Sequence, residues 1–345
     1  MTRLDARGPP STMNFLRHIS AKPYPPAEAI GMLWRGLTGP ATRNPGKLVF
    51  APRRSVLNEI TPALTLGFGG DIMSMFDKPL RFSDPVRAFF APCDHVVMNF
   101  EGIITDRKRY NPDQKHSPRI LDALAQLAPP ERTVLSMANN HTGDFGESEC
   151  RRCIGLLNDR GYRTLGLGDQ PYVDLGDEVR IATGTWWSNR GGDHLAWLED
   201  PLRHVRPGAF NVLFPHWGYE HELYPRAPQV DIMRRWLEQG YDTVVGHHSH
   251  TPQPITVVPT AQGPKVGAYS LGDLCFGMAY KGWPGLKNFP YGMIARMSIG
   301  PRLDDPSRWA TGVLEWSFID CDHRSKQEGF VVDRVERIPF FPTAA

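Results

Sequence analysis

From residue 64 onward the chain carries short apolar runs that are separated by polar segments containing glycine and proline. Each run is short and continuous, which is typical of a strand that is buried on both faces. The runs occupy residues 64–68, 95–100, 133–137, 164–167, 179–183, 211–214, 243–245 and 266–269. We therefore expect strands that are spread over most of the chain.

Helix-like segments lie between several of these runs, at residues 85–91, 118–127, 147–160 and 228–239. Gly161 and Gly240 follow two of them, and glycine is frequent just after the C-terminal end of a helix. The alternation of strands and helices predicts an α/β fold built in layers. Residues 312–320 and 329–338 add further strand-like pattern in the tail.

The first 60 residues differ in texture, because they are rich in proline, glycine and arginine and have only short apolar patches. We expect residues 1–60 to form an irregular arm that lies over the main body or is partly disordered. Residues 61–345 are expected to form the main domain.

Composition excludes several classes of protein. A hydrophobic content of 41% and a formal net charge of +2 are ordinary for a globular protein, and they do not indicate a nucleic-acid partner. No apolar run is long enough to span a membrane, so we expect a cytoplasmic protein without a membrane span.

Five cysteines are an odd number, which favours reduced thiols. Cys150 and Cys153 have the spacing of a redox or zinc motif, but on a helix this spacing also places both on one buried face.

Polar residues that could bind a metal or take part in catalysis follow three of the expected strands. Asp71 follows the run 64–68, Glu101 follows 95–100, and the segment 138–146 after 133–137 contains Asn140, His141 and Asp144. In open α/β sheets, ligands bind beyond the carboxyl ends of the strands, so these side chains can meet in one crevice. Glycine–aspartate and asparagine-rich turns are also common in loops. His141 followed by Asp144 fits a proton donor whose tautomer is fixed by a carboxylate.

Histidines follow two further runs: His216 after 211–214, and His247, His248 and His250 after 243–245. Residues two apart face the same side of an extended or turning backbone, so His248 and His250 can reach one metal site. A solvated histidine cluster is the alternative. Imidazole nitrogen with carboxylate and amide oxygen, and no thiolate, suits zinc, manganese, iron or nickel. Two such ions about 3.5–4 Å apart activate water for hydrolysis.

The ordered set of motifs resembles a known family. The motifs are Gly70-Asp71, Asn99-x-Glu101-Gly102, Asn139-Asn140-His141-x-x-Asp144-x-Gly146, His216-Trp217-Gly218-x-Glu220, Gly246-His247-His248-x-His250 and Tyr269-Ser270-Leu271-Gly272-Asp273. They resemble the bacterial capsule-synthesis (CapA-like, poly-γ-glutamate) family, which is similar in turn to calcineurin-like metallophosphoesterases and 5′-nucleotidases. The resemblance covers about residues 64–300.

This resemblance implies a four-layer α/β/β/α metallophosphoesterase-like sandwich, with residues 61–345 as its catalytic domain. It implies two divalent metal ions, one bound by Asp71 and His250 and the other by Asn140, His216 and His248, with Glu101 as the bridging ligand. His141, oriented by Asp144, would stabilise the transition state or protonate the leaving oxygen. His247 is adjacent to these ligands and has no assigned role.

The sequence departs from the pattern of these families at three places. Met73 stands where the phosphoesterase pattern has histidine, a gap that the capsule-type proteins share. Asp273 stands where the family usually carries asparagine. No N-terminal membrane anchor of the usual type is recognised. The first departure implies that the ion assigned to Asp71 and His250 is weakly held, completed by water ligands or absent.

Three functions remain open at this point. The preferred one is hydrolysis of a phosphoester of a small metabolite. The second is action on γ-glutamyl or other amide bonds of a capsule polymer, since the same activated water can attack an amide. The third is a non-catalytic role in assembly. Candidate substrate contacts are Trp217, Tyr219, Glu220, Tyr224, Arg226, Gln229, Trp186, Trp187, Asn189 and Arg190, because aromatic rings stack and arginines pair with phosphate. Packing of these aromatic residues in the core is the alternative.

Overall fold

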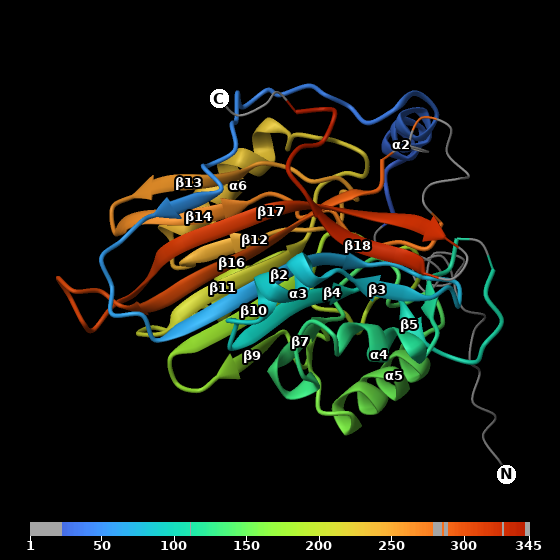
Figure 1. Cartoon of the computed structure of the whole chain (residues 1–345), viewed down its shortest axis with the longest axis horizontal. Coiled ribbons are helices and arrows are strands. Elements are labelled where there is room, and N and C mark those ends of the chain that lie inside the picture. The colour runs from blue at the N-terminus through green and yellow to red at the C-terminus, as the bar shows by residue number, and fades with distance from the viewer. Residues whose placement is uncertain (1–22, 111, 279–284, 286–288, 326–327, 342–345) are drawn as a thin grey trace, which may run out of the picture.

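The apolar runs of the sequence form the strands of two mixed β-sheets that pack face to face (Figure 1). The computed structural model describes residues 23–110, 112–278, 285, 289–325 and 328–341. All eight of the expected strands are present, and two of them, β2 (Leu64–Ile72) and β11 (Phe210–His216), extend further than expected. The expected α/β class is therefore confirmed.

The larger sheet has ten strands in the described part of the chain. They are β1 (Arg54–Val56), β2 (Leu64–Ile72), β3 (Leu80–Phe82), β4 (His95–Phe100), β7 (Thr133–Ser136), β8 (Arg163–Leu165), β15 (Asp273–Cys275), β16 (Tyr291–Pro301), β17 (Trp309–Ser325) and β18 (Gly329–Val335). The order is β3-β18-β17-β16-β2-β4-β7-β8, with β1 paired to β17 and β15 paired to β2. Strands β2, β4, β7 and β8 run parallel, so their carboxyl ends lie at one edge.

The second sheet has the order β13-β14-β12-β11-β10-β9. Its strands are β9 (Tyr172–Leu175), β10 (Val179–Thr185), β11 (Phe210–His216), β12 (Thr243–Val245), β13 (Ile255–Thr260) and β14 (Gly263–Ala268). Strands β10, β11, β12 and β14 are parallel. A short pair, β5 (Ile103–Ile104) and β6 (Lys115–His116), lies outside both sheets.

Helices α3 (Asp84–Phe90), α4 (Arg119–Leu124), α5 (Glu147–Asp159) and α6 (Ala227–Glu238) cover the outer faces of the two sheets (Figure 1). Helix α2 (Pro26–Thr38) lies apart from these faces, and two 3₁₀ turns, η1 (Pro130–Arg132) and η2 (Pro201–His204), are also present. Helices α3 to α6 match the four helices that the sequence predicts. Gly161 and Gly240, which follow α5 and α6, have φ of 92° and 143°, as expected beyond a helix end.

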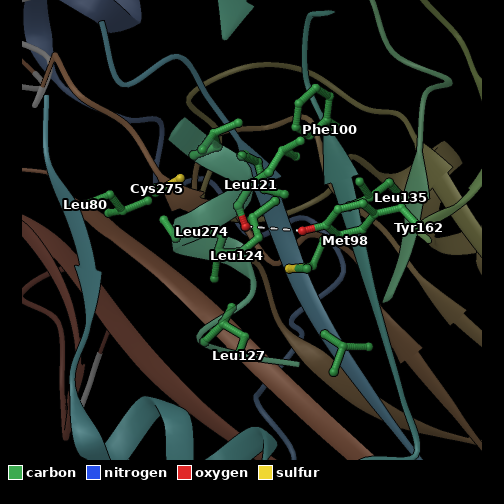
Figure 2. Close-up of a cluster of buried hydrophobic side chains, with 14 of the residues drawn as sticks. Leu80, Met98, Phe100, Leu121, Leu124, Leu127, Leu135, Tyr162, Leu274 and Cys275 are labelled. Atoms are coloured by element: carbon green, nitrogen blue, oxygen red, sulfur yellow. Dashed lines mark hydrogen bonds between the residues drawn. The ribbon is translucent and has the colours of Figure 1, made fainter. Parts of the chain in front are cut away.

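Three buried apolar clusters account for this arrangement. One joins the larger sheet to α3, α4 and α5, a second fills the space between the sheets, and a third joins the second sheet to α6. Figure 2 shows part of the first cluster, where Leu121 and Leu124 of α4 pack against Met98 and Leu135. The Tyr162 hydroxyl, buried in this cluster, donates to the Leu121 carbonyl at 3.2 Å. Burial of these strands on both faces explains their continuous apolar runs.

The cysteines belong to this packing. All five are buried thiols, and Cys150 and Cys153 lie on the inner face of α5 in the first cluster. Burial raises the pKa of the Cys150 thiol to about 12, so it is inert at neutral pH. The fold therefore supports core packing, rather than a redox or zinc site, as the role of Cys150 and Cys153.

The N-terminal segment departs from the expectation of an irregular arm. Residues 26–38 form α2, and Arg54–Val56 form β1, which pairs with β17 at the edge of the larger sheet. Other parts of the segment between residues 23 and 60 are extended or turning. Its boundary as a separate unit stays a prediction. In the described residues, no helix has both the length and the apolar character needed to cross a bilayer.

Gly70 marks a point where two strands of the larger sheet approach too closely for a side chain. A Cβ atom at this position would lie 1.8 Å from the carbonyl oxygen of Gly272. We therefore expect Gly70→Ala to lower the free energy of unfolding by about 3 kcal/mol or more, measured by urea denaturation. Gly155 is the matched control, because it lies exposed in α5 and a Cβ there would meet nothing within 4 Å. Gly155→Ala should stabilise by about 0.5–1 kcal/mol, and equal effects at both positions would contradict the prediction.

Candidate metal centre

The predicted ligands lie at the carboxyl ends of parallel strands from both sheets. Asp71 is at the end of β2 and His216 is the last residue of β11, so these strands run further than the sequence suggested. Glu101 and Asn140 follow β4 and β7, and His248 follows β12. The expected convergence is present in the structure, and all five residues are buried.

The loop after β12 has an unusual backbone. His248 and His250 adopt φ of 95° and 53°, a left-handed region that side chains with a Cβ rarely occupy. Each such residue costs about 1–3 kcal/mol, and strain of this kind concentrates at functional sites. The backbone N–H of His248 donates to Asp71 Oδ2 at 2.9 Å, which ties the loop of one sheet to a strand of the other. This contact holds the histidines over the carboxylates.

Asp71 is held as a carboxylate by its neighbours. Its Oδ1 accepts a hydrogen bond from Asn99 Nδ2 at 2.7 Å and lies 3.0 Å from His247 Nδ1. Burial alone would raise the pKa of Asp71, but His247, His250 and the Asn99 hydrogen bond lower it to about 2. Asp71 therefore presents a charged oxygen at neutral pH.

The pKa of Glu101 is shifted in the opposite direction to that of Asp71. The Glu101 pKa is raised well above the usual value, first by burial and then by the negative charge of Asp71. Its Oε1 atom accepts no hydrogen bond from any residue that the structure describes, although His250 Nε2 lies 3.7 Å away. A buried oxygen that lacks a hydrogen bond indicates a missing partner such as a cation.

His216, at the end of β11, contacts Asn140 from the larger sheet and His247 from the second sheet. Its Nε2 is 2.8 Å from Asn140 Oδ1, and its Nδ1 is 2.9 Å from His247 Nδ1. Burial, followed by the neighbouring His248 and His247, lowers the pKa of His216 well below its usual value. A neutral imidazole is the form that binds metal. His247 thus contacts both Asp71 and His216, a bridging position that the sequence did not assign to it.

His250 has a carboxylate partner that sequence reasoning treated only as a departure. Its Nδ1 lies 2.8 Å from Asp273 Oδ1. Burial would lower the pKa of His250, but Asp273 and Glu101 raise it well above the usual value. A carboxylate that contacts one nitrogen of a histidine and leaves the other for a metal is a common supporting arrangement. Met73, in contrast, is buried next to these residues and offers only a thioether.

Three sets of side chains have donor atoms within 4.8 Å of one another and could hold an ion. They are Asp71, His216 and His247; Glu101, His248 and His250; and Asp71, His250 and Asp273. His247 Nε2 and His248 Nδ1 are also buried without a hydrogen-bond partner among the described residues. The residues present therefore fit divalent metal ions, and the donor chemistry is the nitrogen and oxygen mixture that the sequence predicts.

His141 and Asp144 form the expected pair beside the ligands. His141 Nδ1 lies 2.6 Å from Asp144 Oδ2, and the same oxygen accepts the backbone N–H of Gln114 at 2.9 Å. The pair leaves the other face of the imidazole toward the cavity, which His141 lines. This geometry suits a histidine that moves a proton, since its tautomer is fixed.

Comparison with known proteins agrees with the motif order. The family model described as bacterial capsule synthesis protein PGA_cap matches residues 65–174 and 176–278. The chain belongs to this capsule-synthesis family. The matched residues include every residue that the sequence assigns to metal.

Two curated relatives and one solved structure are similar to this family member. The PGA biosynthesis protein CapA of Bacillus subtilis is 26% identical over 64% of this chain and 64% of its own length. A probable polyglutamine synthesis accessory protein of Mycobacterium tuberculosis is 28% identical over 48% of this chain and 52% of its own. The match thus spans less than two thirds of either relative. A putative 5′-nucleotidase from Staphylococcus aureus, solved in complex with alpha-ketoglutarate, aligns with a TM-score of 0.38 and 13% identity, over 81% of this chain and 56% of its own.

A cavity of about 370 Å³ adjoins the ligands in this capsule-synthesis protein. Of the predicted metal and acid–base residues, Asn140, His141 and His250 line it. Of the predicted substrate contacts, Asn189 and Glu220 line it. Burial raises the pKa of Glu220, with smaller opposing contributions from His250 and His141. Asn189 and Glu220 are therefore the predicted substrate contacts that lie beside the candidate metal ligands.

The other predicted substrate contacts have structural partners away from the cavity lining. Trp217 is 1% exposed, packs against Trp236 and donates its indole N–H to the Tyr269 carbonyl at 3.0 Å. Gln229 accepts the Arg226 N–H at 3.1 Å at the start of α6. For Trp217, the alternative of core packing is the one that the structure supports.

The remaining candidates lie around the loop that follows His216. Arg226 is bound to two carboxylates and lies over the ring of Tyr219 at 3.5 Å. Tyr224 packs edge-on against Phe341, and Arg190 forms an ion pair with the buried Asp113 at 2.6 Å. Trp186 packs on Trp217, and the Trp187 indole N–H donates to the Gly218 carbonyl at 2.7 Å. None of these six candidates is among the residues that line the cavity.

Sequence reasoning missed four polar residues of the cavity: Tyr24, Arg109, Gln114 and His221. Arg109 belongs to the basic run 107–109 in the loop between β5 and β6, and this run is a signal that could have been used. Gln114 precedes β6 and gave no signal. Tyr24 lies in a segment without periodic pattern, so only the tertiary structure shows where its hydroxyl lies.

Proposed function

We propose that this chain is a dinuclear metal-dependent hydrolase that cleaves a phosphoester of a small metabolite. The observation that carries the proposal is the convergence of Asp71, Glu101, His216 and His248 next to a cavity lined by His141. Buried carboxylates and imidazoles in such numbers are costly unless they bind something. The composition of this cluster supports metal rather than a purely structural network.

The proposed ligand sets extend those implied by the resemblance. Asp71 and His250 would hold one ion, and Asp273 contacts His250 Nδ1. Asn140, His216 and His248 would hold the other, and Glu101 would supply a carboxylate to the same centre. Metal ions bound here would supply Lewis-acid activation of the substrate and of water. Manganese, zinc, iron and nickel all suit this donor set.

The protein's own groups supply binding and proton transfer. His141, fixed through Nδ1 by Asp144, protonates the leaving oxygen through its other nitrogen. Arg109 is the guanidinium in the cavity lining, and its Nε is held by the Asp113 carbonyl at 2.6 Å. We propose that Arg109, rather than Arg190 or Arg226, pairs with the phosphate. Asn189 and Gln114 offer amides for hydrogen bonds to the rest of the substrate.

Action on γ-glutamyl amide bonds is the second candidate. It is favoured by the family match and by relatives that are described as proteins of PGA biosynthesis and polyglutamine synthesis. The metal centre serves both reactions, because a tetrahedral or phosphoryl transition state needs the same stabilisation of developing negative charge.

A substrate screen separates these functions. We expect the purified protein with added manganese to release phosphate from phosphomonoesters or phosphodiesters, and to lose this activity when a chelator removes the metal. Cleavage of γ-glutamyl peptides without phosphate release would establish the second candidate. Absence of bound divalent metal in protein purified without chelator would support a non-catalytic assembly role.

A further inference from the structure

Tyr24 brings a phenol from the N-terminal segment to the candidate metal centre. Its hydroxyl oxygen lies 2.6 Å from His248 Nε2 and accepts the backbone N–H of Glu220 at 3.2 Å. The ring packs edge-on against Trp187, with centroids 4.6 Å apart. This residue lies outside the segment that matches the capsule-synthesis family.

The helix that follows Tyr24 is attached firmly to the loop after His216. Glu28 forms two hydrogen bonds of 2.7 Å with the guanidinium of Arg226. Arg35, which is 8% exposed, donates to the Glu220 carbonyl at 2.7 Å and lies 3.4 Å from Glu222. Bidentate and partly buried pairs of this kind give a fixed geometry. The position of Tyr24 is therefore built into the fold rather than set by a loose tail.

Tyr24 contacts one ring nitrogen of His248, and the other, Nδ1, is buried without a hydrogen-bond partner among the described residues. Nε2 of His248 needs a free lone pair to accept the phenol proton, and the same lone pair would bind an ion. Donor atoms that share one ion at about 2.1 Å each lie about 3 Å apart. The Tyr24–His248 pair at 2.6 Å and the Asn140–His216 pair at 2.8 Å lie at hydrogen-bond distance, slightly closer than two donors of one ion.

We propose that Tyr24 is a further ligand of the ion held by His216 and His248, an inference that rests on the metal centre proposed above. On binding, the phenol O–H bond breaks, the proton leaves to solvent, and the phenolate oxygen coordinates the metal while it keeps the Glu220 N–H as a hydrogen-bond donor. Asn140, His216 and His248 are neutral donors, so the phenolate adds a negative charge that balances the ion. A hard anionic oxygen of this kind makes the position suitable for ferric iron.

Iron reconstitution tests this ligand without any turnover. We expect the wild-type protein loaded with iron(III) to show a visible charge-transfer band from phenolate to iron. Tyr24→Phe should lose the band and bind zinc at least about tenfold more weakly in competition with a coloured chelator. Tyr219→Phe is the matched control, because its ring centroid lies 6.2 Å from that of Tyr24, and it should keep the band.

The outcomes separate the competing explanations. A band that persists in Tyr24→Phe, or iron-loaded wild type without a band, would overturn the assignment. Tighter zinc binding by Tyr24→Phe would show that the phenol competes with the metal, and would overturn it as well. If wild type binds neither iron nor zinc, the metal centre fails and this ligand with it. Bound metal and a visible band without phosphoesterase activity would remove only the proposed substrate.

Discussion

His216→Ala is expected to abolish metal-dependent hydrolysis, with a fall in kcat/KM of about a thousandfold or more. The imidazole lies in the middle of the cluster, with Nε2 2.8 Å from Asn140 and Nδ1 2.9 Å from His247. Its removal takes away a neutral donor and leaves the Asn140 oxygen without this contact. Lewis-acid stabilisation is worth several kcal/mol, which corresponds to about three orders of magnitude in rate. Activity at saturating manganese and metal content by elemental analysis are the measurements.

The control for this variant is a histidine outside the cluster. His204 is half-buried in η2 and stacks against Tyr172, so His204→Ala should keep both metal and activity. Asn140→Ala should behave like His216→Ala, because its amide oxygen lies 2.8 Å from His216 Nε2 and is assigned to the same proposed ion. Full metal content and activity in His216→Ala would show that this residue is not a ligand.

The fold follows from the sequence because its signals are local. Each parallel strand is buried on both faces, so it appears as a continuous apolar run, and α5 and α6 end at glycines. The extent of β2 and β11 was underestimated, since both continue into glycine, proline and polar residues at the site. In a single sequence, glycine, proline and polar residues of this kind predict a loop rather than a strand. The α2 helix was missed, because proline and glycine surround a short apolar stretch.

The clustering of the candidate ligands could be predicted for a related reason. They follow directly after recognisable strands, and the topology of a parallel sheet brings such positions together. The substrate contacts have no such rule, since they come from long loops whose path depends on tertiary packing. Trp217 thus lies in the core, while Tyr24 and Arg109 reach the cavity from segments distant in sequence. Asp273 was noted only as a departure, although it contacts His250 at 2.8 Å.

His141→Ala is expected to lower kcat by about 10²- to 10⁴-fold and to leave the metal content unchanged. His141 lines the cavity but contacts none of the predicted carboxylate or histidine ligands by a hydrogen bond among the described residues. Its Nδ1 is occupied by Asp144, so only the other nitrogen is available to the substrate. Removal of the imidazole therefore removes a proton donor and not a ligand. Single-turnover kinetics together with elemental analysis would measure both effects.

Asp144→Asn sharpens the assignment, because it keeps the size of the side chain at position 144 while it removes the charge. The amide cannot balance the charge of the imidazolium that donates the proton, and its NH₂ group can point at His141 Nδ1, which favours the neutral imidazole, a much weaker acid. We expect a lower kcat with normal metal content, and the largest loss with substrates whose leaving oxygen most needs a proton. Substrates with a good leaving group, such as a nitrophenolate, should be much less affected by either variant. If His141→Ala lost metal to the same extent as His216→Ala, the imidazole at 141 would have to be a ligand and the acid–base role would fail.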